Sequence, residues 1–220
     1  MNDELTRHII SVLDHGIKLK ERLASGEHLL LDAETARLKQ MLWGEGAVRG
    51  HPDYGDNLPR PVLPDNREFL GVRYALASWL DEIFVEDPYS PWREAWKDRA
   101  LESDVYGGSQ ERAWRFWVQA ELAEKRPGAE ALEAYLWCVM LGFRGDPRLV
   151  NPAEWAERVR RRVLAARQQE VRLPADLNLR TNVPALRGRD RFRTAVRVLV
   201  VVAAAGILAA TKVVTDYLSR

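Results

Sequence analysis

Two adjacent carboxylates, Asp81 and Glu82, interrupt an otherwise apolar run from Ala75 to Val85. Paired carboxylates can act as general acid and general base, but neighbouring residues on a helix point about 100° apart. A tight catalytic dyad is therefore a poor interpretation of this pair alone. Two interpretations stay open: a buried acid that bonds a nearby helix terminus or an arginine, and an acidic patch that binds a protein partner.

A second motif follows an apolar helix about 60 residues later and consists of Leu141, Gly142, Phe143, Arg144 and Gly145. Gly142 and Gly145 permit a positive φ or close packing at the helix end. Arg144 would lie near the negative end of the helix dipole, where it could pair with Asp81 or Glu82. We expect a structural role for this motif, with that pairing joining the two motifs in one core.

Other chemistry finds little support in the residue pattern. The four histidines, His8, His15, His28 and His51, are scattered over the first quarter of the chain without metal-ligand spacing. No phosphate-binding glycine motif and no nucleophile elbow occurs. Cys138 lies in the apolar run YLWCVMLGF, as a small core residue would. The sequence therefore predicts no catalytic residue, no cofactor and no metal.

The elements that must position these residues are helices, because helix breakers are frequent and strand-like alternation is nearly absent before the C-terminal tail. We expect an all-α domain of about seven helices. They cover 4–24, 31–48, a segment started by an Asp65–Glu68 capping box, a segment opened by Ser90-Pro91, 109–124, 130–143, and a helix that starts at Asn151-Pro152. The 130–143 helix is apolar nearly all round, which predicts the centre of a bundle.

The C-terminal tail predicts a transmembrane helix. Residues 198–211 carry no charge and lie between Arg197 and Lys212. Because both flanking side chains can reach the interface, 195–214 can serve as one span, and twenty residues at about 1.5 Å each match a hydrocarbon core of roughly 30 Å. Twelve Arg against three acidic residues between 158 and 197 place the N-terminal side in the cytoplasm.

This pattern predicts four regions: a cytoplasmic helical domain (1–173), a basic juxtamembrane linker (174–194), a transmembrane helix (195–214) and a short periplasmic tail (215–220). The net charge of +1 hides a basic segment beside the span, which suits anionic lipid better than nucleic acid. We expect no nucleic-acid partner and no cleaved signal peptide. Small residues at 203–206 and 209–210 would allow a homodimer through the span.

Taken in order, the motifs resemble the DotU/TssL (IcmH) family. The resemblance rests on Tyr74–Glu82, on Pro91, Trp92, Trp96 and Leu101, on Glu133–Tyr135, on Leu141–Gly145, and on the C-terminal span. Members of this family are inner-membrane accessory proteins of type VI secretion systems, with relatives in type IVB systems.

The resemblance implies two helical bundles and a non-enzymatic adaptor of the bacterial inner membrane. It implies that the chain joins an IcmF/TssM-type protein and docks the cytoplasmic baseplate and tail of the apparatus. Asp81 and Glu82 are the residues expected at the docking surface, with the 141–145 motif supporting its shape. Two alternatives stay open: a type IVB subunit of the same family, and a tail-anchored enzyme, which would need a deep polar pocket with convergent titratable groups.

Overall fold

Amphipathic periodicity and glycine breaks divide the chain into helices. The structure, a computed structural model, describes residues 3–55, 68–107 and 111–170. Nine helices and no strand occur in these residues. The helices are α1 (Asp3–Ala24), α2 (Leu31–Trp43), α3 (Gly46–Arg49), α4 (Val72–Val85), α5 (Arg93–Lys97), α6 (Leu101–Tyr106), α7 (Arg112–Glu124), α8 (Glu130–Met140) and α9 (Pro152–Glu170). The all-α class predicted from the sequence is confirmed.

The two additional helices arise where predicted helices break. The helix predicted over 31–48 ends at Trp43, because Gly44 adopts a positive φ of 66°, and α3 begins at Gly46, whose φ is 54°. The segment opened by Ser90-Pro91 also divides, into α5 and α6, and α5 begins only at Arg93. The helix predicted to reach Phe143 ends at Met140.

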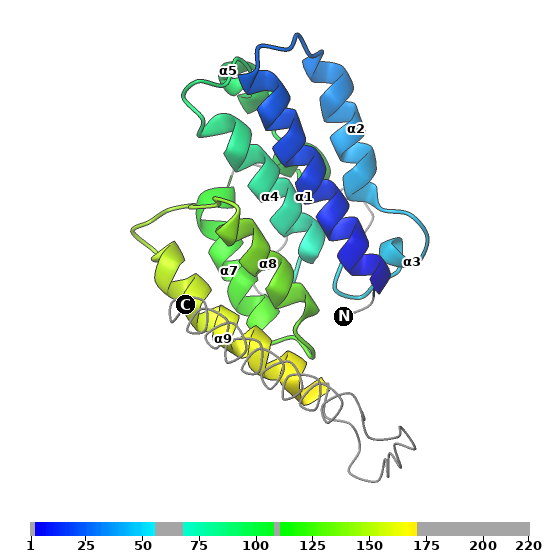
Figure 1. Cartoon of the computed structure of the whole chain (residues 1–220), viewed down its shortest axis with the longest axis vertical. Helices are drawn as coiled ribbons and strands as arrows, with labels where there is room; N and C mark the ends of the chain where they lie inside the picture. The colour runs from blue at the N-terminus through cyan, green and yellow to red at the C-terminus, as the bar shows by residue number, and fades with distance from the viewer. Residues whose placement is uncertain (1–2, 56–67, 108–110, 171–220) are drawn as a thin grey trace, which may run out of the picture. The chain divides into compact units, whose positions relative to one another are not determined.

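The helix at the centre of the fold is α4. All fourteen of its residues are buried, whereas α8, predicted as the central helix, leaves Met140 63% exposed. Helices α1 and α2 pack on one side of α4, and α7 and α8 pack on it from the other (Figure 1). Helix α9 lies along α8. Both groups of helices therefore pack on α4 inside one compact unit, Met1–Arg172, and the division into two bundles that the family resemblance implies stays a prediction.

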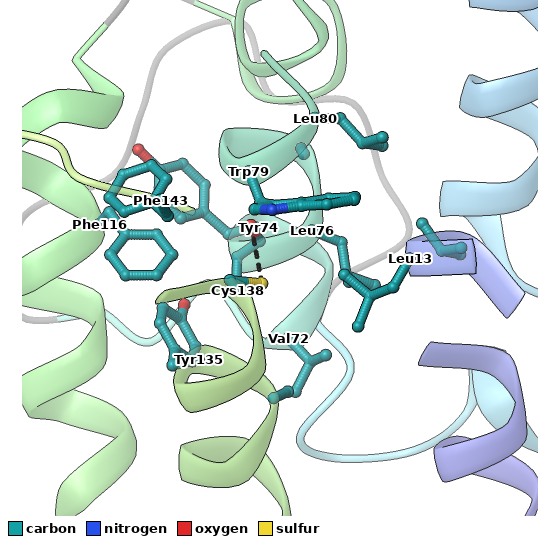
Figure 2. Close-up of a cluster of buried hydrophobic side chains, with 14 of the residues drawn as sticks. Leu13, Val72, Tyr74, Leu76, Trp79, Leu80, Phe116, Tyr135, Cys138 and Phe143 are labelled. Carbon is teal, nitrogen blue, oxygen red and sulfur yellow. Dashed lines mark hydrogen bonds between the residues drawn. The ribbon is translucent and has the colours of Figure 1, made fainter. Parts of the chain in front are cut away.

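Large apolar side chains fill both sides of α4. Figure 2 shows Leu76 and Leu80 directed toward Leu13 of α1, while Phe116 and Phe143 lie on the opposite side. The rings of Phe116 and Phe143 stack with centroids 3.8 Å apart. Burying a side chain of this size contributes about 2–3 kcal/mol, so the core holds the 141–145 segment against α7.

The start of α4 differs from the sequence prediction. Asp65 lies outside the described residues and Glu68 is not helical, so the helix has no capping box at these positions and begins at Val72. The chain enters the helix through Gly71, whose φ of 88° suits glycine. The segment before it is held by the buried Gln119 of α7, whose Oε1 accepts from Leu70 N at 2.7 Å and whose Nε2 donates to Glu68 O at 2.9 Å.

Replacing Gln119 by leucine is expected to lower the free energy of unfolding by about 2–3 kcal/mol. A leucine of similar size leaves the Leu70 N–H without an acceptor in a buried site, and it also removes the donor to Glu68. Gln119→Glu, compared with the other proteins near pH 4 so that its carboxyl is protonated and uncharged, is the matched variant, since it keeps an acceptor for Leu70 N and has an O–H donor in place of the amide. Denaturant unfolding should place the glutamate variant between the leucine variant and the wild type; equal stability of all three would contradict this.

The predicted linker, span and periplasmic tail lie outside the described residues, and they stay predictions. Within 3–55, 68–107 and 111–170, no helix has both the length and the apolarity required to cross a bilayer.

Candidate functional site

Asp81 lies on α4 and is fully buried. Its carboxylate accepts three hydrogen bonds: Oδ1 from Trp96 Nε1 at 2.9 Å and from Leu101 N at 2.7 Å, and Oδ2 from Glu102 N at 2.8 Å. Leu101 and Glu102 are the first residues of α6, so Asp81 satisfies N–H groups that have no partner inside that helix. One of the two open interpretations, a buried acid bonded to a helix terminus, describes this residue.

A second buried carboxylate, Glu102, lies beside Asp81. Its Oε1 accepts from the Tyr74 hydroxyl at 2.6 Å, and its Oε2 accepts from Arg112 N at 3.0 Å. Burial raises the pKa of Asp81 to about 6 and that of Glu102 to about 7, while the N–H and O–H donors hold both values down. The pair is thus built from Asp81 and a glutamate 21 residues away, which sequence spacing could not show.

Glu82 bonds the second motif. Its Oε1 accepts from the backbone N–H groups of Arg144 and Gly145, each at 2.8 Å, and the side chain is buried. The predicted link between the two motifs is therefore present, but the main chain of the motif makes it and the Arg144 guanidinium does not. Gly145 has a φ of 59°, and a Cβ there would lie 2.5 Å from Ala113 O. Only glycine fits this approach of the loop to α7.

The bonded motifs form one wall of a surface groove of about 480 Å³, which we call the motif groove. It is lined by Lys20, Glu82, Ile83, Glu86, Asp87, Pro88, Arg112, Ala113, Leu141, Gly142, Arg144 and Gly145. Arg112 is buried, and its guanidinium lies 3.8 Å from both Glu82 and Glu86. Glu86 is 63% exposed and Arg144 is exposed. The groove thus offers charges of both signs to a protein surface.

The sequence of the chain matches one known protein family. The model of the family described as "Type VI secretion system protein DotU" matches residues 64–218 of the 220. The chain belongs to the DotU family. Comparison with curated proteins and with solved structures found no match. The matched region contains Asp81, Glu82, the 141–145 motif and the apolar run 198–211, so the family resemblance of the sequence is confirmed.

Membership in DotU makes this chain a type VI secretion accessory protein. The match does not test the docking role predicted for Asp81 and Glu82, and the structure gives both a bonding role. Asp81 is fully buried, and Glu82 is only 5% exposed, so neither carboxylate projects from the surface. Of the acidic residues that line the motif groove, the most exposed is Glu86, which directly follows the last residue of α4.

The remaining residues singled out for chemistry have structural positions. Cys138 is fully buried, its Sγ donates to Ala75 O at 3.6 Å, and burial raises the pKa of the thiol (Figure 2). This confirms it as a core residue. His8 and His15 are half-buried, and His8 Nε2 lies 2.8 Å from the Tyr54 hydroxyl. In the described part of the chain, no three His, Cys, Asp or Glu side chains gather as metal ligands would.

The raised pKa of Glu102 predicts that the free energy of unfolding depends on pH. Its pKa is about 7 in the folded protein against an ordinary value of 4.5, so the folded state binds more protons between these values. Its contribution to stability is present below about pH 4.5 and is lost as the pH rises through 7. Between pH 5 and pH 8, the stability of the wild type relative to Glu102→Gln should fall by roughly 2 kcal/mol.

Thermal unfolding of both proteins across this pH range measures the effect. Titration of His8 and His15 affects both proteins alike and cancels in the difference. A constant difference between wild type and variant from pH 5 to pH 8 would show that Glu102 has an ordinary pKa.

Proposed function

We propose that this DotU-family protein is a non-enzymatic adaptor of the type VI secretion membrane complex. In this proposal, residues 195–214 anchor the chain in the bacterial inner membrane, with the helical domain in the cytoplasm and residues 215–220 in the periplasm. The domain joins an IcmF/TssM-type protein and docks the baseplate. The observation that carries the proposal is the motif groove, one wall of which is made by two of the segments on which the family resemblance rests.

The hydrogen bonds made by the buried titratable groups favour an adaptor over an enzyme. The buried acids Asp81, Glu82 and Glu102 each accept hydrogen bonds from backbone N–H groups, and these bonds hold α6, α7 and the 141–145 segment in place. A general acid or base instead needs an atom within reach of a substrate. Because these three carboxylates bond backbone groups of the protein itself, they favour a role in shaping a binding surface over a role in catalysis.

The anchoring part of the proposal rests on sequence. The uncharged run 198–211, its flanks Arg197 and Lys212, and the excess of arginine before it favour a single span with its basic side on the cytoplasmic leaflet. Anionic lipid is then a partner of the basic linker, and a second copy can associate through the small residues of the span. The family description names the type VI system, and we place the chain there rather than in a type IVB apparatus.

Charge reversal at the rim of the motif groove tests the docking proposal. Glu86→Lys changes an exposed residue, so the fold should persist, and recovery of the IcmF/TssM-type protein or of baseplate subunits from native membranes should fall several-fold. Glu94→Lys on α5 is the matched control, because Glu94 is also exposed, lines no part of the groove and pairs with its neighbour Lys97. Equal recovery with both variants would contradict docking at this groove.

A further inference from the structure

A second groove, between α1 and α8, is almost entirely apolar. It has a volume of about 390 Å³ and is lined by Ile10, Leu13, Asp14, Ile17, Trp137, Met140 and Leu141. We call it the α1–α8 groove. Seven large apolar side chains are exposed among the described residues, and three of these, Ile10, Met140 and Leu141, line this one groove. Apolar side chains gathered in this way mark a site for another molecule, whereas single exposed ones do not.

The buried side chain of Trp79 contacts both helices that line the α1–α8 groove. Trp79 of α4 is 1% exposed, and its Nε1 donates to Leu141 O at 3.3 Å, directly after α8. A Cβ on Gly16 of α1 would lie 2.7 Å from the Trp79 ring, so α1 approaches this ring closely. Figure 2 shows the ring extending from α4 toward the side where Leu13 lies. Trp79 therefore holds α1 and the end of α8, the two sides of the groove, against the same buried ring.

The α1–α8 groove adjoins the motif groove, because Leu141 lines both. Three residues beyond Leu141 lies Arg144, an exposed residue of the motif groove. Across the described ranges, no carboxylate pairs with the Arg144 guanidinium. Asp14, the one charged residue of the apolar groove, is already paired with Lys18 at 2.7 Å. The apolar groove therefore lies beside a second groove that holds the Arg144 guanidinium, a positive charge with no carboxylate partner among the described residues.

We infer that this groove binds an amphipathic helix of a partner protein, with apolar residues at i, i+3 or i+4, and i+7 in the groove and an acidic residue near Arg144. The inference rests on the proposed adaptor function and names the chemistry of one partner segment. A second copy of the chain is a poorer occupant, since a stable dimer buries about 800 Å² per partner and three partly exposed side chains supply only a fraction of that.

Site-specific photo-crosslinking in the full chain tests the inference. A benzophenone amino acid replaces Ile10 or Met140, one on each side of the groove, in cells that assemble the secretion apparatus, and adducts are mapped by mass spectrometry. Leu164 on α9 is the matched control, because its exposure of 51% equals that of Ile10. Both groove positions should label the same partner peptide, with helical apolar spacing and an adjacent acid, and Leu164 should not label it.

Arg144 supplies the charge test. Arg144→Glu should lower the yield of the Met140 adduct by about fivefold, whereas Arg144→Lys should retain it. Adducts only with a second copy, only with lipid, or with a peptide lacking an acid would overturn the inference, as would absence of adducts or equal labelling from Leu164. Recovery of the IcmF/TssM-type protein is scored separately, so the adaptor function can survive when the groove inference fails.

Discussion

Replacing Asp81 by alanine is expected to lower the free energy of unfolding by about 4 kcal/mol. The substitution leaves three buried donors without an acceptor: Trp96 Nε1–H and the backbone N–H groups of Leu101 and Glu102. Each buried unsatisfied donor costs about 1–3 kcal/mol, and two of these belong to the first turn of α6. Against a typical total of 5–15 kcal/mol, such a loss leaves the domain marginal.

Thermal unfolding and amide hydrogen exchange of the full chain in detergent measure this loss. A change of this size corresponds to a drop in Tm of roughly 8–16 °C, and the amides of α6 should exchange faster than those of α9. Asp81→Asn keeps the acceptor for Trp96 and Leu101 but presents an amide donor to the Glu102 N–H, so it should be intermediate. A wild-type Tm for Asp81→Ala would mean that this carboxylate does not hold α6.

Replacing Glu82 by alanine is expected to cost about 3 kcal/mol and to loosen the 141–145 motif. Glu82 Oε1 is the acceptor for the N–H groups of both Arg144 and Gly145, which have no helical partner at this position. The same carboxylate also faces the buried Arg112 guanidinium at 3.8 Å, and removing it leaves the exposed Glu86 as the one carboxylate within 4 Å of that charge among the described residues. The wall of the motif groove would then lose its shape.

Glu82→Gln separates two contributions of this side chain: the hydrogen bonds that shape the groove wall, and its negative charge. Its Oε1 can still accept both N–H groups, so exchange at Arg144 and Gly145 should stay slow, and recovery of the membrane partner should stay near wild type. Glu82→Ala should lose both. If Glu82→Gln abolished partner recovery in a folded protein, the negative charge of Glu82 would itself be part of the docking contact, and the bonding role of this carboxylate would be only part of its function.

Local patterns predicted the helices and the joining of the two motifs well. The periodicity of α1 and the break after Glu124 follow from amphipathicity and glycine or proline positions, and Asp81 and Glu82 attracted attention because charge inside an apolar run demands a partner. The resemblance rested on the same residues, and it placed the chain in the family that the comparison shows.

Long-range partners could not be predicted from the sequence. Glu102, Arg112 and Gln119 lie on α6 and α7, and nothing in their local sequence distinguishes them from surface residues. Their roles come from tertiary contacts with α4 and its N-terminal approach. The break between α2 and α3 was missed because glycines inside an apolar pattern can stay helical at a modest cost, and the positive φ of Gly44 depends on its surroundings. The central position of α4 also could not be predicted, because it depends on how the other helices pack around it.

Co-purification from native membranes with an N-terminal tag, followed by mass spectrometry, tests the adaptor function most directly. We expect recovery of an IcmF/TssM-type protein together with baseplate subunits, and a marked loss of both with Glu86→Lys but not with Glu94→Lys. Recovery of neither partner, with the wild-type protein folded and present in the membrane fraction, would contradict the adaptor role.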